Sequence, residues 1–236
     1  MNQLTATARL LWQDKRALAI LWGVALAWLG ALALFALTSQ ATLAQVGLTF
    51  LSLALAPLLF FYWQALAVSY ANGIKTGAWL RGAVRGIGRL WLASVPLLLL
   101  AGALVYWFGA WASTPESPVL TVLRLVVGGF LWPLVAVHLW RAAWHDGVLG
   151  AWQRGAQIVR QALAPETLLL YAQGWLFFAL LPYLLLWARL PGSWGRGQVV
   201  WLVVRLALAL ALACLGWSVT VIALGHKASG NAKKVH

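Results

Sequence analysis

Acidic residues are scarce in this 236-residue chain, which has only four: Asp14, Glu116, Asp146 and Glu166. Charged residues of both signs make up 9% of the sequence, whereas a soluble domain has about 25%. So few charges cannot cover the surface of a water-soluble globule, and an apolar content of 63% excludes a disordered chain. The composition therefore predicts an integral membrane protein.

Residues that carry enzyme chemistry are also scarce. Cys214 is the only cysteine, so an intramolecular disulfide is excluded. The sequence has four histidines and no Walker loop, HExxH or GxSxG motif. None of the four carboxylates lies in the middle of a long apolar run, where a proton-coupled transporter usually needs one. We therefore expect neither an enzyme nor a metal protein, and the sequence identifies no cofactor.

Long apolar runs, by contrast, are abundant. A helix needs about 20 apolar residues to cross about 30 Å of hydrocarbon. Six runs are long enough, at about 17–37, 42–71, 90–113, 119–140, 166–188 and 197–225. We predict an all-α integral membrane protein in which residues 1–236 form a single polytopic domain with six transmembrane helices.

Positive charge is distributed unevenly over the connections between these runs. Thirteen of the 17 Lys and Arg residues lie before the first run, between the second and third, between the fourth and fifth, or after the sixth. Arg189 and Arg196 lie on the opposite side, and Arg124 and Arg205 lie inside spans. Such an asymmetry predicts a cytoplasmic (inner) membrane protein with both termini in the cytoplasm. The basic residues follow no nucleic-acid-binding motif, so we expect anionic lipid headgroups as partners and no nucleic acid.

Two of the basic connections repeat each other. The heptapeptides at 77–83 (GAWLRGA) and 150–156 (GAWQRGA) are identical at six of seven positions. Each follows a polar residue and a glycine, Asn72-Gly73 in the first copy and Asp146-Gly147 in the second. Because both copies lie on the same side of the membrane, the repeat predicts two related halves in parallel orientation.

Each copy is also predicted to form a short interfacial helix on the cytoplasmic side, at about 76–89 and 149–162. A basic face opposite an apolar face is typical of a helix whose arginines bind lipid headgroups. A helix packed on the ends of the spans is a second interpretation, compatible with the first. The candidate headgroup-binding residues are Arg81, Arg85, Arg89, Arg154 and Arg160.

At these residues the chain resembles six-span bacterial membrane families grouped with the glycerophosphoryl-diester-phosphodiesterase membrane domain. The resemblance covers about 60–110 and 138–188. It consists of a polar–Gly break, a small residue, an aromatic residue, Arg-Gly-Ala, further basic positions and a new span. It implies an all-helical six-span fold of uncharacterised function and transfers no site residue.

Histidine and tryptophan supply the remaining candidate contacts. His138 and His145 fall roughly on one face of a continuous helix, which is compatible with a pigment, haem or metal ligand or with ordinary interfacial hydrogen bonding. Of the 17 tryptophans, ten lie near predicted interfaces, as in an aromatic belt, and Trp63, Trp79 and Trp140 are among these ten. Six lie deeper, Trp132 and Trp175 among them, and these could line a ligand cleft, contact another subunit or pack between helices.

These observations predict a non-enzymatic accessory or scaffold subunit of a larger membrane complex, acting through membrane lipids and other membrane protein subunits. The alternative is a small-molecule or lipid transporter built from two parallel repeats. A third hypothesis is a pigment- or haem-binding subunit that uses His138, His145, Trp132 and Trp175. For Arg124 and Arg205 we expect side chains that extend toward the outer interface, the alternative being a site that attracts anions.

Overall fold

The structure is a computed structural model that describes residues 3–38, 42–73, 77–111, 125–187 and 196–232, and the regular structure in these ranges is entirely helical. The elements are α1 (Gln3–Gln13), α2 (Lys15–Leu37), α3 (Leu43–Ala71), α4 (Gly77–Trp111), the π-helical segment η1 (Leu125–Leu131), α6 (Trp132–Gln153), α7 (Gly155–Ala162), α8 (Pro165–Trp175), the π-helical segment η2 (Leu176–Leu180), α9 (Leu181–Trp187) and α10 (Arg196–Ala232).

Six stretches of helix in this part of the chain are long and apolar enough to cross a membrane, which confirms the predicted all-α multi-pass membrane fold. They are Lys15–Leu37, Leu43–Ala71, Ala78–Ala103, Val126–Gln153, Pro165–Trp187 and Gly197–His226. Residues 112–113, 119–124 and 188 of the predicted spans lie outside the described residues.

The two segments predicted as short interfacial helices, at about 76–89 and 149–162, have different bounds in the structure. The first does not stop at residue 89, because α4 runs without a break from Gly77 to Trp111. Its glycines are tolerated in the helix, and its arginines and leucines favour helix, so nothing ends it where the span begins. In the second copy the segment is divided at Arg154. The part before it is the end of α6, beyond a kink at Gly147, and the part after it is the short helix α7.

Local signals explain several helix ends. Asp14 caps α2, its side chain accepting a hydrogen bond from the backbone N–H of Ala17 at 3.1 Å. Thr42 and Gln45 form a reciprocal capping box at the start of α3. At the other end of α3, the chain turns away through Gly73 at φ +71°, a conformation that costs glycine little.

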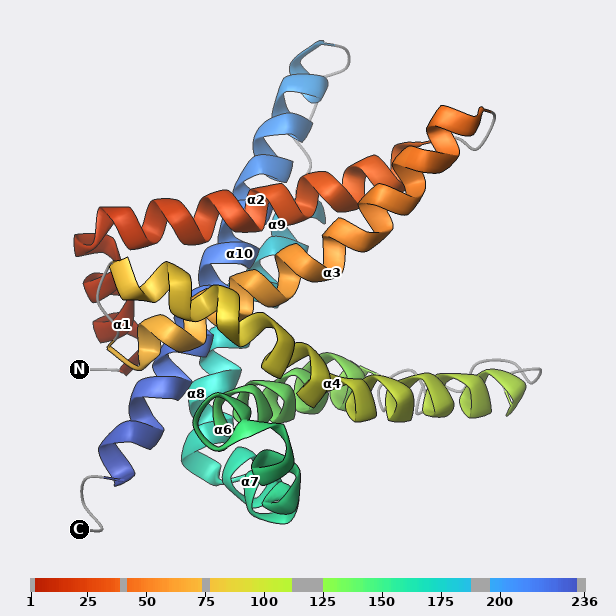
Figure 1. Cartoon of the computed structure of the whole chain (residues 1–236). Helices are drawn as coiled ribbons and strands as arrows, with labels where there is room; N and C mark the ends of the chain where they lie inside the picture. The colour runs from red at the N-terminus through yellow and green to blue at the C-terminus, as the bar shows by residue number, and fades with distance from the viewer. Residues whose placement is uncertain (1–2, 39–41, 74–76, 112–124, 188–195, 233–236) are drawn as a thin grey trace.

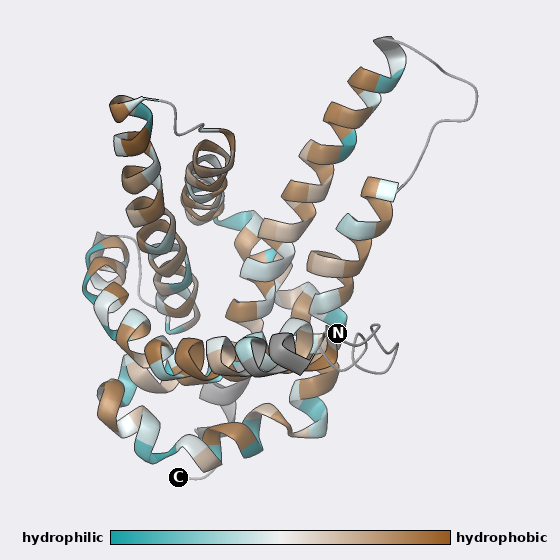
Figure 2. Ribbon diagram, turned by 90° about the vertical axis from the view of Figure 1, so that its right-hand side faces the viewer, coloured by the Kyte–Doolittle hydropathy of each residue, from teal (hydrophilic) through white to brown (hydrophobic). Residues whose placement is uncertain are grey.

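Three helical hairpins diverge from a common end, which we call the base (Figures 1 and 2). The hairpins are α2–α3, α4–α6 and α9–α10. The base contains α1, the start of α2, the end of α3, the start of α4, the end of α6, α7, α8 and the end of α10 (Figure 1).

The packed core lies toward the base. Every residue from Trp63 to Ser69 in α3 and from Ser218 to Gly225 in α10 is buried, whichever side of the helix it is on. At the opposite end of α10, Val199 and Val203 are 60% or more exposed. The outer parts of the hairpins are apolar and open, as expected of helices that lie in lipid.

α1 is an element that the sequence analysis did not anticipate. Leu4, Thr7 and Leu11 are buried on one side of it, and the helix packs against α10, α2 and α8. The spacing of three and four residues between these positions was the available signal. The signal is weak because Leu10 and Trp12, which are also apolar, lie on the exposed side, so the sequence shows no clear difference between the two sides of the helix.

Candidate functional site

The two predicted repeat copies share a backbone feature as well as a sequence. Gly73 has φ +71° and Gly147 has φ +75°, and in the described residues they are the only glycines with positive φ. Each follows the polar residue of its copy and precedes the Gly-Ala-Trp sequence. An L-residue with a side chain is strained in this conformation, so the same local chemistry redirects the chain in both copies.

The two breaks are also in contact. His145, next to the second break, has its Nε2 atom 3.2 Å from Oδ1 of Asn72, the polar residue of the first break. Asp146 forms an ion pair with Arg154 across the second break, with 3.1 Å between Oδ1 and Nη2. The repeated segments therefore meet at the base.

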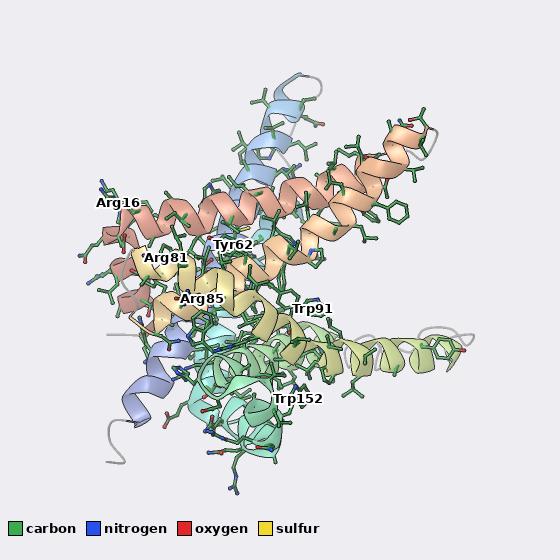
Figure 3. The ribbon with its side chains drawn as sticks, viewed as in Figure 1. Arg16, Tyr62, Arg81, Arg85, Trp91 and Trp152 are labelled. Carbon is green, nitrogen blue, oxygen red and sulfur yellow. The ribbon has the colours of Figure 1, made fainter. Side chains whose placement is uncertain are left out.

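The start of α4 presents a basic surface there. Trp79, Ala83, Gly86 and Leu90 are buried on the inner side of the helix. Arg81, Arg85 and Arg89 are exposed and follow one another at intervals of four residues. Figure 3 shows Arg81 and Arg85 on the first turns of α4, with Trp91 further along the same helix.

Contacts with α6 orient this surface. Arg89 donates a hydrogen bond from Nη1 to the carbonyl oxygen of Trp144 at 3.4 Å. A side chain at Gly86 would collide with the ring of Trp144, so glycine is required for this approach. The inner side of α4 is thus occupied by protein, and Arg81 and Arg85 are left on the outer side.

In the second copy, the arginines are exposed but the helix packs more on protein. Arg154 is held by Asp146, and Arg160 lies in the last turn of α7, where a positive charge suits the helix dipole. Ile158 and Ala162 of α7 are buried. This arrangement agrees with the interpretation of a helix packed on the span ends. That the five arginines bind lipid headgroups stays a prediction.

The candidate histidines lie in different surroundings. His138 is 9% exposed within α6, whereas His145 is exposed and contacts Asn72. Seven residues of α-helix separate their backbones by about 10 Å. The structure therefore does not bring the two histidines into one site. Within the described ranges, no group of three or more His, Cys, Asp or Glu residues could hold a metal ion.

Four tryptophans instead connect helices. Between α3 and α10, Trp63 donates to Ser218 Oγ at 3.0 Å and Trp217 donates to Gln64 Oε1 at 2.8 Å. These two bonds run in opposite directions, one from each helix. In a membrane interior an unsatisfied polar group is costly, so each bond favours this packing over separated helices.

Two more indole bonds extend the connections to α4 and α6. Trp140 donates to Ser94 Oγ at 2.7 Å, and Trp79 donates to the carbonyl oxygen of Leu66 at 2.9 Å. Trp63, Trp79 and Trp140 were expected in the interfacial belt, yet all three are at most 4% exposed. Hydropathy gave no sign of this burial, because it does not distinguish the side of a helix that faces protein.

The candidate Trp175 lies in an aromatic cluster formed by residues of η1, α8, η2 and α10. Its ring centroid is 6.3 Å from that of Phe130, which is 4.9 Å from Tyr171. Phe178 joins the cluster to Trp217 at 5.1 Å. These contacts agree with packing between helices as the role of Trp175. Trp132, the other candidate, is partly buried at the start of α6.

Arg205 has a protein partner in the outer part of α10. Its Nη1 donates to the carbonyl oxygen of Leu186 at 3.0 Å. That carbonyl belongs to the last turn of α9, where helical carbonyls lack partners and a positive charge is favoured. Arg124 and Glu116 lie outside the described residues.

No family model, curated protein or solved structure matches this chain.

Proposed function

We propose that this protein is a non-enzymatic subunit of a larger membrane assembly, acting at its base through anionic lipids and neighbouring membrane proteins. The observation that carries this proposal is that the polar side chains fall into two sets with different surroundings. The indole, serine and glutamine groups at the centre of the bundle bind one another, while the arginines lie exposed at the base. The first set stabilises a bundle, and the second lies on the surface of the base, where anionic partners would bind.

Cys214 provides an internal test of this proposal. It is the only cysteine in the chain, is 4% exposed, and its carbonyl oxygen accepts a hydrogen bond from Ser218 beside Trp63. In a subunit with a dry helical core, a water-soluble maleimide should not label Cys214 in intact liposomes or detergent, but should label it after unfolding in SDS. Gln153→Cys in a Cys214→Ser background, at an exposed position, is the positive control.

The assembly itself is tested by native purification in mild detergent followed by mass spectrometry of the particle. Proteins that co-purify in fixed stoichiometry are expected. A protein that purifies only as a monomer with no partner would contradict the subunit role.

A transporter made of two parallel repeats is the second candidate. It is favoured by the matched glycine breaks at Gly73 and Gly147 and by the contact of Asn72 with His145 between them. Such breaks are places where two halves could move relative to each other. The same maleimide experiment discriminates, because a water-filled path through the bundle would make Cys214 reactive in the folded protein.

A further inference from the structure

The first turns of α4 carry a surface that combines a hollow with positive charge. The hollow has a volume of 290 Å³ and is lined by Leu80, Arg81, Val84 and Arg85. These residues lie one turn apart in two adjacent rows, so the apolar pair and the basic pair run side by side along the helix. Two of the four lining residues are therefore apolar and two carry guanidinium groups.

The length of α4 places this surface at the level of lipid headgroups. Its 35 residues would extend about 52 Å at 1.5 Å per residue. About 20 residues, or 30 Å, suffice for the hydrocarbon. The remaining length exceeds what modest tilt absorbs, so one end of α4 reaches beyond the acyl chains. The end of α4 that carries the arginines is the end suited to the polar headgroup region. Trp91, which is 47% exposed, is suited to the boundary between the headgroups and the acyl chains.

Charge complementarity selects the occupant of the hollow. Arg81 and Arg85 are both exposed and lie one turn apart on the same helix. Guanidinium groups bind phosphate through paired, charge-assisted hydrogen bonds. Val84, 58% exposed, offers apolar surface directly beside them.

We infer that this hollow is a binding site for one anionic phospholipid, with its phosphate on Arg81 and Arg85 and the upper part of an acyl chain on Leu80 and Val84. The inference rests on the proposed function and deepens it, since it replaces a general attraction to the membrane by a defined site. A free phosphate ion would use only the arginines and gain nothing from the apolar lining.

The test uses the full chain purified in detergent and mixed with equal amounts of dioleoylphosphatidylglycerol and dioleoylphosphatidylcholine. Native mass spectrometry then counts the lipids retained by each protein molecule. We expect one phosphatidylglycerol to be retained in preference to phosphatidylcholine. Inorganic phosphate at millimolar concentration should not release it, and release by phosphate would identify an ion site and overturn the assignment to a lipid.

Two variants separate the site from diffuse attraction. Val84→Trp fills the hollow without changing any charge and should reduce retention about tenfold. Arg81→Gln with Arg85→Gln should reduce the preference for phosphatidylglycerol tenfold or more, because two charge-assisted hydrogen bonds are lost. The charge-matched control is Lys15→Gln with Arg16→Gln, at two exposed positions on α2, and it should retain the lipid.

The outcomes are distinct from those of the proposed function. Equal loss in the control pair, or full retention by Val84→Trp, would overturn the site while leaving the dry core and the protein partners untouched. Labelling of Cys214 would contradict the subunit role without bearing on lipid retention. Size-exclusion chromatography checks that each variant is folded, and Val84→Ala, which opens the hollow further, should lower retention less than Val84→Trp.

Discussion

The indole hydrogen bonds make a sharp prediction about serine. Three buried serines, Ser52, Ser94 and Ser218, each donate a hydrogen bond to a carbonyl oxygen one turn earlier in their own helix. Ser94 and Ser218 also accept an indole N–H from another helix, at 2.7 Å and 3.0 Å. No indole bond to Ser52 is seen in the described part of the chain. The same Ser→Ala substitution should therefore have different consequences at the three positions.

The magnitude follows from what each substitution leaves behind. Ser94→Ala leaves the indole N–H of Trp140 without its acceptor, and Ser218→Ala leaves the indole N–H of Trp63 without its acceptor. Leaving a buried donor unsatisfied costs about 1–3 kcal/mol in proteins, and interhelical bonds in membrane proteins contribute about 0.6 and at most about 1.7 kcal/mol. We therefore expect losses of about 1–2 kcal/mol. Ser52→Ala removes only a bond within one helix, which stabilises little or nothing.

The assay is unfolding of the purified protein by SDS in mixed micelles, followed by tryptophan emission. No tryptophan is altered in any of the three variants, so the signal stays comparable. The double variant of Ser218→Ala with Trp63→Phe should lose less than the two single losses added together, since both remove the same bond. If Ser94→Ala and Ser218→Ala unfolded at the same SDS fraction as Ser52→Ala, the interhelical role of the tryptophans would be refuted.

Three further predictions concern glycines and topology. Gly225→Val should lower stability by about 1–3 kcal/mol, because a Cβ at residue 225 would lie 2.5 Å from the Cβ of Ala71. Gly30→Val is the control and should have little effect, since a Cβ at residue 30 has no neighbouring atom within 4 Å. Unfolding in SDS measures both variants. Gly73→Ala and Gly147→Ala should each lower the free energy of unfolding by about 1–2 kcal/mol in the same assay, since both glycines have positive φ. A loss of stability in only one of the two variants would contradict the structural equivalence of the two repeat copies. A C-terminal green fluorescent protein should fluoresce in cells while alkaline phosphatase fused there stays inactive, with the reverse for fusions inserted after Thr38.

The sequence went furthest with properties that depend on local composition. Each apolar run from 17–37 to 197–225 overlaps a candidate span in the described residues, because the cost of placing a helix in lipid is set by the residues of that helix alone. The glycine breaks could be found for the same reason. Asn72-Gly73 and Asp146-Gly147 both precede the repeated Gly-Ala-Trp, and the backbone turns through a left-handed glycine in each.

The candidate ligand contacts were less predictable. His138 and His145 share one helix in the sequence, yet one lies in the core and the other contacts Asn72 at the base. Trp175 could have lined a cleft, and its neighbours Phe130 and Tyr171 come from segments about 40 residues apart. Helical periodicity assigns a face to a residue, but it does not say whether lipid, protein or water covers that face.

By itself, the sequence determined that this is a helical multi-pass membrane protein, and it marked the repeated basic segments, because transfer into lipid and local backbone conformation depend on neighbouring residues. Only the tertiary structure decided which tryptophans are buried, that Arg205 binds the end of α9, and that α4 carries its arginines beside an apolar hollow. Those features depend on contacts between distant segments. Ser52 and Ser218 look alike in the sequence, and only the approach of α3 to α10 gives one of them a partner.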